Sequence, residues 1–170
     1  MKKLLLIIGF AAVVVVLILL AQRAFIPGAQ KQTKLNENVN GSVSAGKVLD
    51  LSNKNLAKIP ADVFDRSDLE VLNVANNKLT GAIQSQIGQL TNLKVLNASN
   101  NQMTGVPAEV GRLRNLEVLD LSNNQLTGLP NELGNLQNLK TLNLSGNKYS
   151  TQDLDGIRAK LPSTVNIILK

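Results

Sequence analysis

The residue types that most often perform catalysis or bind metals are missing from this sequence. Its 170 residues include no histidine and no cysteine. The commonest general bases, zinc ligands and activated nucleophiles are therefore unavailable, and the fold can use neither disulfides nor thiolate metal sites. We expect no catalytic residues, no metal and no cofactor.

Carboxylates are the remaining groups that could act as a catalytic pair. Asp50 and Asp120 occupy equivalent positions of an internal repeat, three copies apart. If each copy supplies one strand of a sheet, the two acids lie roughly 14 Å apart, because neighbouring strands are about 4.8 Å apart. The carboxyl groups of glycoside hydrolases are about 5–10 Å apart. Both acids are therefore predicted to be solvated and not to form a catalytic pair.

The elements that position these side chains come from a repeat of 23 or 24 residues. Leu69, Leu93, Leu116 and Leu139 begin segments that superimpose on one another. Each segment follows the pattern L-x-x-L-x-L-x-x-N-x-L, with conservative replacements of some leucines. An earlier copy runs through Leu49, Leu51, Leu56, Ile59 and Pro60. A period in this range is typical of a solenoid.

The L-x-L part of the pattern predicts one short strand per copy with an apolar inner face. A single copy cannot bury its own leucines, so the copies must stack and form a continuous core. We expect an α/β solenoid of about five repeats over residues 46–170, with a short curved parallel sheet on the concave side and loops or short helical turns on the convex side. A capping helix from Ser150 to Leu161, with a Ser150–Asp153 capping box, and a last strand through Val165, Ile167 and Leu169 should close the C-terminal end.

This sequence resembles the leucine-rich-repeat family over residues 46–170. Segments such as LTGLPNELGNLQNL are similar to the subtype of plant receptor ectodomains and many bacterial proteins. Plant ectodomains usually carry cysteine-paired caps, which are absent here, so the resemblance favours a bacterial-type relative. It implies a binding scaffold and no particular activity.

A different segment precedes the repeats. Residues 4–21 are 18 uncharged, almost wholly apolar positions, about 27 Å long as a helix and close to the thickness of a bilayer core. We expect residues 1–21 to be a transmembrane signal anchor. The alternative is a signal peptide removed after Ala21, which would leave a secreted protein. Residues 22–45 are polar and predict a flexible tether, of which residues 39–45 alternatively form an N-terminal cap.

The positive charge belongs mainly to the flanks of this apolar segment. Five of the 18 basic residues and one of the 12 acidic residues precede residue 46. The repeats are therefore nearly neutral, which argues against nucleic acid as a partner. Basic residues are more closely spaced before the segment, at Lys2 and Lys3, than after it. This favours a cytoplasmic N-terminus and extracytoplasmic repeats.

Outward-facing strand positions form three columns that are the candidate binding surface. The first contains Val48, Val71, Val95, Val118 and Thr141. The second contains Asp50, Asn73, Asn97, Asp120 and Asn143. The third contains Ser52, Ala75, Ser99, Ser122 and Ser145. These columns are monotonous, whereas binding surfaces specialised for one large partner are enriched in aromatic and arginine anchors.

Two further columns predict structural roles. Asn77, Asn101, Asn124 and Asn147 recur where each strand ends, and we expect their amides to satisfy backbone groups of the turn. The second column precedes the strands and alternates in charge: Lys47, Glu70, Lys94, Glu117 and Lys140. Opposite charges on adjacent strands predict a ladder of ion pairs that sets strand alignment. A recognition stripe is the functional alternative.

The sequence favours a non-enzymatic interaction module, anchored in the lipid bilayer through residues 4–21, that binds a protein or carbohydrate partner. A structural or self-associating envelope spacer is the alternative. A third alternative is an enzyme with an unrecognised acid site, or a regulatory subunit of one.

Overall fold

The structure, a computed structural model, describes residues 47–170. The predicted anchor at residues 1–21 and tether at residues 22–45 lie outside this part of the chain. Between residues 47 and 170, no helix combines the length and the apolar character that a membrane crossing requires.

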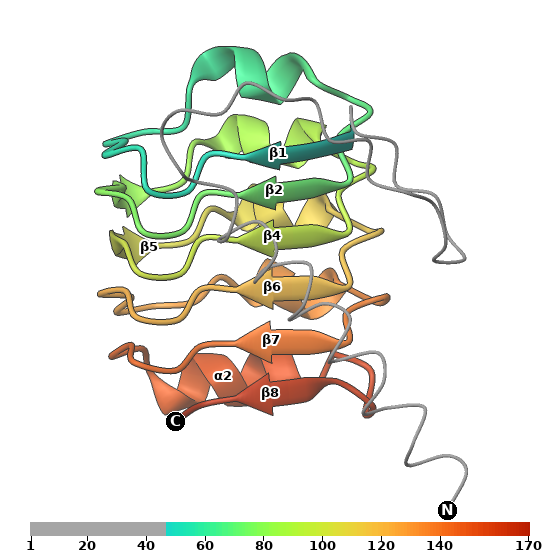
Figure 1. Ribbon diagram of the computed structural model, residues 1–170. Helices are drawn as coiled ribbons and strands as arrows, with labels where there is room; N and C mark the ends of the chain where they lie inside the picture. Colours follow the sequence, from blue (N-terminus) through green and yellow to red (C-terminus); the bar gives the residue numbers. More distant parts are fainter. Residues whose placement is uncertain (1–46) are drawn as a thin grey trace, which may run out of the picture. The chain divides into compact units, whose positions relative to one another are not determined.

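Six short strands form one parallel sheet in the order β1-β2-β4-β6-β7-β8 (Figure 1). The first five come from successive repeats, and the sixth follows the C-terminal helix. Their bounds are β1 Val48–Asp50, β2 Val71–Asn73, β4 Val95–Asn97, β6 Val118–Asp120, β7 Thr141–Asn143 and β8 Asn166–Ile168. The predicted parallel sheet is therefore confirmed.

Helical turns lie behind this sheet (Figure 1). They are the 3-10 helices η2 Ala61–Asp65, η3 Ser85–Gln89, η4 Ala108–Arg112 and η5 Asn131–Asn135. A second parallel sheet is formed by β3 Thr80–Ala82 and β5 Gln102–Gly105. One 3-10 turn and one strand alternate in each repeat, so the leucines between them are enclosed from both sides.

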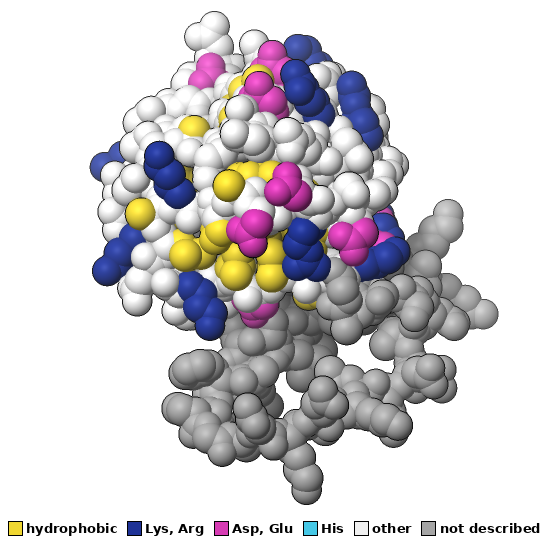
Figure 2. All heavy atoms as spheres, turned by 90° about the horizontal axis from the view of Figure 1, so that it is seen from above, with side chains coloured by type: hydrophobic (Ala, Val, Ile, Leu, Met, Phe, Trp, Pro, Cys, Tyr) yellow, Lys and Arg dark blue, Asp and Glu magenta, His cyan; other side chains and the backbone are white. Residues whose placement is uncertain are grey.

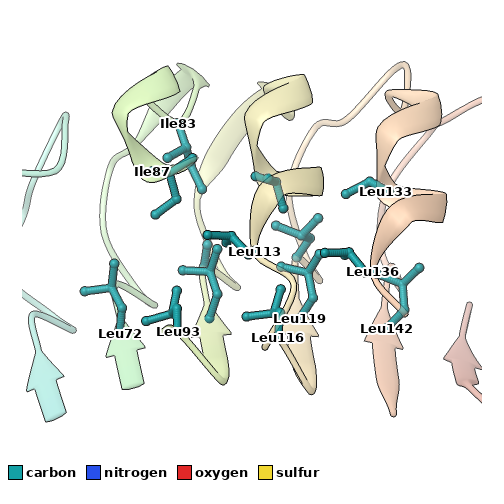
Figure 3. Close-up of a cluster of buried hydrophobic side chains, with 14 of the residues drawn as sticks. Leu72, Ile83, Ile87, Leu93, Leu113, Leu116, Leu119, Leu133, Leu136 and Leu142 are labelled. Atoms are coloured by element: carbon teal, nitrogen blue, oxygen red, sulfur yellow. The ribbon is translucent and has the colours of Figure 1, made fainter. Parts of the chain in front are cut away.

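The core lies between the six-stranded sheet and the helical turns (Figure 3). Leu72, Leu96, Leu119 and Leu142, the central residues of four successive strands, are fully buried. Each fully buried leucine contributes about 1.5–3 kcal/mol relative to an exposed one. Every repeat covers its neighbour's leucines, which is the physical reason that the repeats must stack.

The C-terminal end differs in detail from the sequence expectation. Helix α2 runs over Thr151–Arg158, and the Ser150 hydroxyl accepts a hydrogen bond from the Gln152 N–H. The Asp153 carboxylate instead accepts the Leu129 N–H of the preceding repeat at 3.2 Å. The expected capping box is therefore wrong, because Asp153 links the helix to its neighbour. The last strand ends before Leu169, whose side chain is 37% exposed.

Candidate functional site

The outward residues of the six-stranded sheet lie in register across the repeats. Val48 pairs with Val71, Val71 with Val95, and Val95 with Val118. The same register places Thr141 beside Val118 and continues to Asn166 on β8. The first predicted column is therefore a continuous row of β-branched side chains on the outer face.

These apolar side chains remain partly open to solvent. Val48 is 41% exposed, and Val71, Val95, Val118 and Thr141 have intermediate exposure. The charged column lies beside them on the residues that precede each strand. We call the two columns together the valine–charge stripe. It contains Lys47, Val48, Glu70, Val71, Lys94, Val95, Glu117, Val118, Lys140 and Thr141.

Glu70 is the centre of the charged column. Its carboxylate binds the ammonium groups of Lys47 at 2.5 Å and Lys94 at 2.8 Å, and its side chain is only 10% exposed. Hydrogen bonds from Lys47 and then Lys94 lower the pKa of Glu70 below its usual range, and the hydrogen bond to Glu70 raises the pKa of Lys47. Glu117 binds Lys140 at 2.7 Å further along. The ion pairs therefore join the first three repeats and the last two, and no ion pair between Lys94 and Glu117 is found in the described structure. The expected ladder is interrupted there, and its role in strand alignment stays a prediction.

Residues of the second and third columns bind each other. In each of the five repeats, the second-column side chain accepts a hydrogen bond from the backbone N–H of the third-column residue, two positions later. Ser99 and Ser122 also donate their hydroxyl groups to Asn97 and Asp120, at 2.8 and 2.6 Å. These local turns use part of the acceptor capacity that these side chains would otherwise offer to a partner.

Five residues expected on the open surface are buried in this arrangement. Exposure falls to 6% for Asn73, 2% for Ala75, 4% for Asn97, 6% for Ser99 and 5% for Ser122. Adjacent repeats cover them because their side chains fold back onto the strand ends. The second and third columns are therefore buried in the middle repeats and partly exposed at the two ends, whereas the first column is at least partly exposed along its whole length.

The asparagines at the strand ends link successive repeats. The Asn101 amide group donates to the carbonyl oxygens of Val74, Ala98 and Ser99 at 3.0–3.1 Å, and its oxygen accepts the Leu79 N–H at 3.0 Å. Asn77, Asn124 and Asn147 make equivalent bonds. Each side chain thus satisfies backbone groups from two repeats.

Lys54 replaces this asparagine in the first repeat. The side chain of Lys54 is exposed, and its backbone N–H donates to the Asn77 oxygen at 2.9 Å. The position accepts a charged residue because it lies at the N-terminal end of the described repeats.

Two other asparagine columns were missed by the sequence reasoning. Asn92, Asn115 and Asn138 each donate to a carbonyl oxygen of the preceding repeat, at 2.7–2.9 Å. Asn76, Asn100 and Asn123 adopt positive φ angles of 53–56°, a conformation that asparagine tolerates better than most residues. Both sets recur with the repeat period, and that recurrence is the signal that could have found them.

The described part of the chain, residues 47–170, contains no group of three or more acidic, histidine or cysteine residues that could hold a metal ion.

Comparisons with known proteins agree with this architecture. A family model described as a leucine-rich repeat region matches residues 26–155. No curated protein sequence matches the chain. Solved structures with a similar fold come from both bacteria and plants.

A leucine-rich-repeat protein of Leptospira interrogans is 40% identical with a TM-score of 0.60, over 65% of this chain and 28% of that protein. The ectodomain of the plant receptor kinase GASSHO1/SCHENGEN3 from Arabidopsis thaliana is 37% identical with a TM-score of 0.56, over 66% of this chain and 14% of that one. An internalin from Listeria monocytogenes is 25% identical with a TM-score of 0.57, over 65% and 31% of the two chains.

This chain thus spans less than a third of each of these structures. The family model, in contrast, covers most of the chain, and the described strands and turns recur with the period of that family. The protein therefore belongs to the leucine-rich-repeat family.

Proposed function

We propose that this protein is a membrane-anchored interaction module that binds a protein partner through its valine–charge stripe. The observation that carries the proposal is that the first column stays at least partly exposed along its whole length, whereas the second and third columns are buried in the middle repeats. Val71, Val95 and Val118 are partly exposed, whereas most of the neighbouring Asn and Ser side chains are engaged with each other. Burial of the partly exposed apolar side chains under a partner would favour binding, and the charges beside them would orient that partner.

The relatives support a protein as the partner. The plant ectodomain that is 37% identical to this chain was solved in complex with Casparian strip integrity factor 2. Proteins of this fold are generally non-enzymatic interaction modules, which agrees with the lack of histidine and cysteine in the sequence.

Site-specific photocross-linking in cells tests the stripe. A photoreactive amino acid replaces Val95 or Val118 in the full-length chain, and the matched control replaces Gln89, an exposed residue of η3 behind the sheet. We expect a discrete cross-linked protein from the two valine positions and none from Gln89. Equal cross-linking at all three positions, or none at any, would contradict a binding role of the stripe.

We also propose that residues 4–21 anchor the protein, with the repeats on the extracytoplasmic side. A membrane-impermeant amine reagent should label exposed lysines such as Lys58, Lys78 and Lys148 in intact cells. Labelling only after lysis would place the repeats inside. Intact mass of the membrane-bound chain should include residues 1–21, and a released chain beginning at Gln22 would instead support secretion.

The alternative function is a structural spacer without a specific ligand. The observation that favours it is the internal pairing of the second and third columns, which stabilises the scaffold and leaves few polar groups for recognition. Sedimentation of the full-length protein shows whether such a spacer is monomeric or associates with itself. Concentration-dependent self-association without any cross-linked partner would favour the spacer over the interaction module.

A further inference from the structure

The charges of the valine–charge stripe have a complement in a second copy of the same stripe. From β1 to β7 their signs alternate, and the order is the same from either end: Lys47, Glu70, Lys94, Glu117 and Lys140. A matching partner must present the opposite signs at the strand spacing of about 4.8 Å. A copy of this chain does so, at four of the five positions, when it is reversed and moved along by one strand.

Two-fold symmetry produces this arrangement when the axis runs along the strands, between β4 and β6. In a two-fold dimer, residue i contacts residue j of the other copy and j contacts i in return. This axis reverses the order of the strands and brings each column opposite the same column of the other copy. An axis along the stack would instead bring every lysine opposite its own copy. Like charges that face each other oppose association, so the reversed arrangement is favoured.

The interruption of the ion pairs selects the position of the axis. No ion pair joins Lys94 to Glu117 within the described residues, and their side chains are 49% and 30% exposed. An axis between β4 and β6 would bring Lys94 of each copy opposite Glu117 of the other. An axis between β2 and β4 would place Glu70 at the centre instead. Glu70 is only 10% exposed and already binds two lysines, so the first axis is favoured.

The apolar column fits the same position of the axis. Val95 would lie opposite Val118 of the second copy, and Val71 would lie opposite Thr141. All four side chains are partly exposed in the single chain. Their mutual burial would therefore favour association.

The overall charge of the repeats permits two copies to approach each other. Residues 47–170 include 13 basic and 11 acidic side chains, which leaves a net charge of +2. Figure 2 looks along the stack from the β1 end and shows basic and acidic side chains interspersed on that surface. Long-range repulsion between two copies is therefore small.

We propose that the partner of the valine–charge stripe is a second copy of this chain, bound about a two-fold axis between β4 and β6. This inference rests on the proposed binding role of the stripe and names its partner. Lys94 and Glu117 form two equivalent ion pairs across the axis, and the valines pack against each other beside them. The stripe is two columns wide and roughly 25 Å long, which is small for a permanent dimer, so the association is weak and reversible.

Charge exchange between two variants of the full-length protein tests this arrangement. Lys94→Glu and Glu117→Lys each put like charges opposite each other in a dimer of identical chains. A mixture of the two variants restores opposite charges at both central pairs. We expect each variant alone to self-associate roughly tenfold more weakly than wild type, and the mixture to recover close to the wild-type strength. Energy transfer between donor- and acceptor-labelled chains measures the association, with the dyes on Gln89→Cys behind the sheet.

The mixture also separates contact between copies from effects on folding. Each variant loses an ion pair within its own chain, but mixing changes neither chain, so the recovery reports on the interface alone. The matched controls are Lys148→Glu and Glu132→Lys, the same charge reversals at exposed positions outside the stripe. We expect both controls to associate as wild type does.

Thiol cross-linking tests the register without any change of charge. The chain has no cysteine of its own, so a short bis-maleimide joins only introduced thiols. A mixture of Val95→Cys and Val118→Cys chains should give a cross-linked dimer. Gln89→Cys chains should give none, because this residue lies behind the sheet.

Three results would overturn the proposal. The first is a mixture of the charge variants that associates no better than either variant alone, with all chains folded. The second is equal cross-linking of the Gln89→Cys chains and the valine pair. The third is a photocross-linked product at Val95 that contains a different protein and no product of twice the chain mass, which would leave the proposed function standing. Absence of every product at Val95 would contradict the proposed function as well.

Discussion

Asn101 illustrates how single side chains hold this fold together. It is 8% exposed and makes one hydrogen bond as an acceptor and three as a donor, to backbone groups of two repeats. Removing this side chain leaves the backbone groups that it binds unsatisfied, at a cost of about 1–3 kcal/mol for each group that water does not reach.

Replacing this asparagine should therefore destabilise the domain. We expect Asn101→Ala to lower the free energy of unfolding by about 2–4 kcal/mol, because several backbone groups lose their partner at once. The matched control is Asn92→Ala, which removes one exposed bond to the Ser67 carbonyl oxygen. Urea denaturation should show less than about 1 kcal/mol for the control. Equal losses in the two variants would contradict the role given to Asn101.

The pKa of Glu70 makes a specific contribution to stability against acid. Two lysines lower this pKa in the folded protein. The folded state therefore gains stability above the ordinary glutamate pKa near 4.5, and this gain is lost as the pH falls through the lower folded value.

Replacement of Glu70 by glutamine should remove this part of the pH dependence. Wild-type protein should lose more of its melting temperature between pH 6 and pH 3 than Glu70→Gln does, and the variant should already be less stable at pH 6. Partly exposed ion pairs contribute about 0.2–1 kcal/mol each, so the difference is a few degrees at most. Glu132→Gln, a change at an exposed residue of η5, is the control. A variant whose acid sensitivity equals that of wild type would contradict this assignment.

Among the elements, the helical turns pack at a distance set by glycine. A Cβ atom added at Gly111 of η4 would overlap the Glu132 carbonyl oxygen of η5 and lie 2.8 Å from its carbonyl carbon. Glycine is therefore required there by the close approach of two backbones. Gly105, at the end of β5, has no such neighbour, because its nearest contact would be the Ala82 Cβ at 4.0 Å.

The contrast between these glycines predicts different effects of the same substitution. Gly111→Ala should lower the free energy of unfolding by about 1–3 kcal/mol, the usual cost of inserting a methyl group into a packed region. Gly105→Ala should change it by less than about 1 kcal/mol. Thermal melting of both variants gives the comparison, and a neutral Gly111→Ala would show that η4 and η5 can move apart freely.

The strands were predictable from the sequence, whereas the environment of their outward residues was not. Alternation in L-x-L determines which side of a strand is apolar, so the inner positions of Leu96 and Leu119 follow directly. The burial of Asn97 and Ser122 depends on how each side chain turns back to bind its own strand end, and on the cover supplied by the next repeat. A pattern of residue types does not contain that geometry.

For the whole molecule, the repeat period predicted the stacking, but not which part of its surface stays open. The columns look equally outward in the sequence. In the structure, residues of the second and third columns hydrogen-bond to each other and are buried in the middle repeats, whereas the first column stays at least partly exposed throughout. The C-terminal strand was predicted through Leu169. In the structure β8 pairs with β7 from Asn166 to Ile168, and Ile168 lies opposite Asn143, the last residue of β7, so Leu169 has no partner on β7.

Binding by the stripe is the central claim, and the affinity for the protein cross-linked at Val95 tests it most directly. The measurement compares full-length wild type with Val95→Lys/Val118→Lys and with Thr104→Lys, an exposed change on β5 of the second sheet. Two buried charges in the contact should weaken binding at least tenfold, about 1.4 kcal/mol, with the control within twofold of wild type. Unchanged affinity in the stripe variant, with both variants folded, would contradict the account.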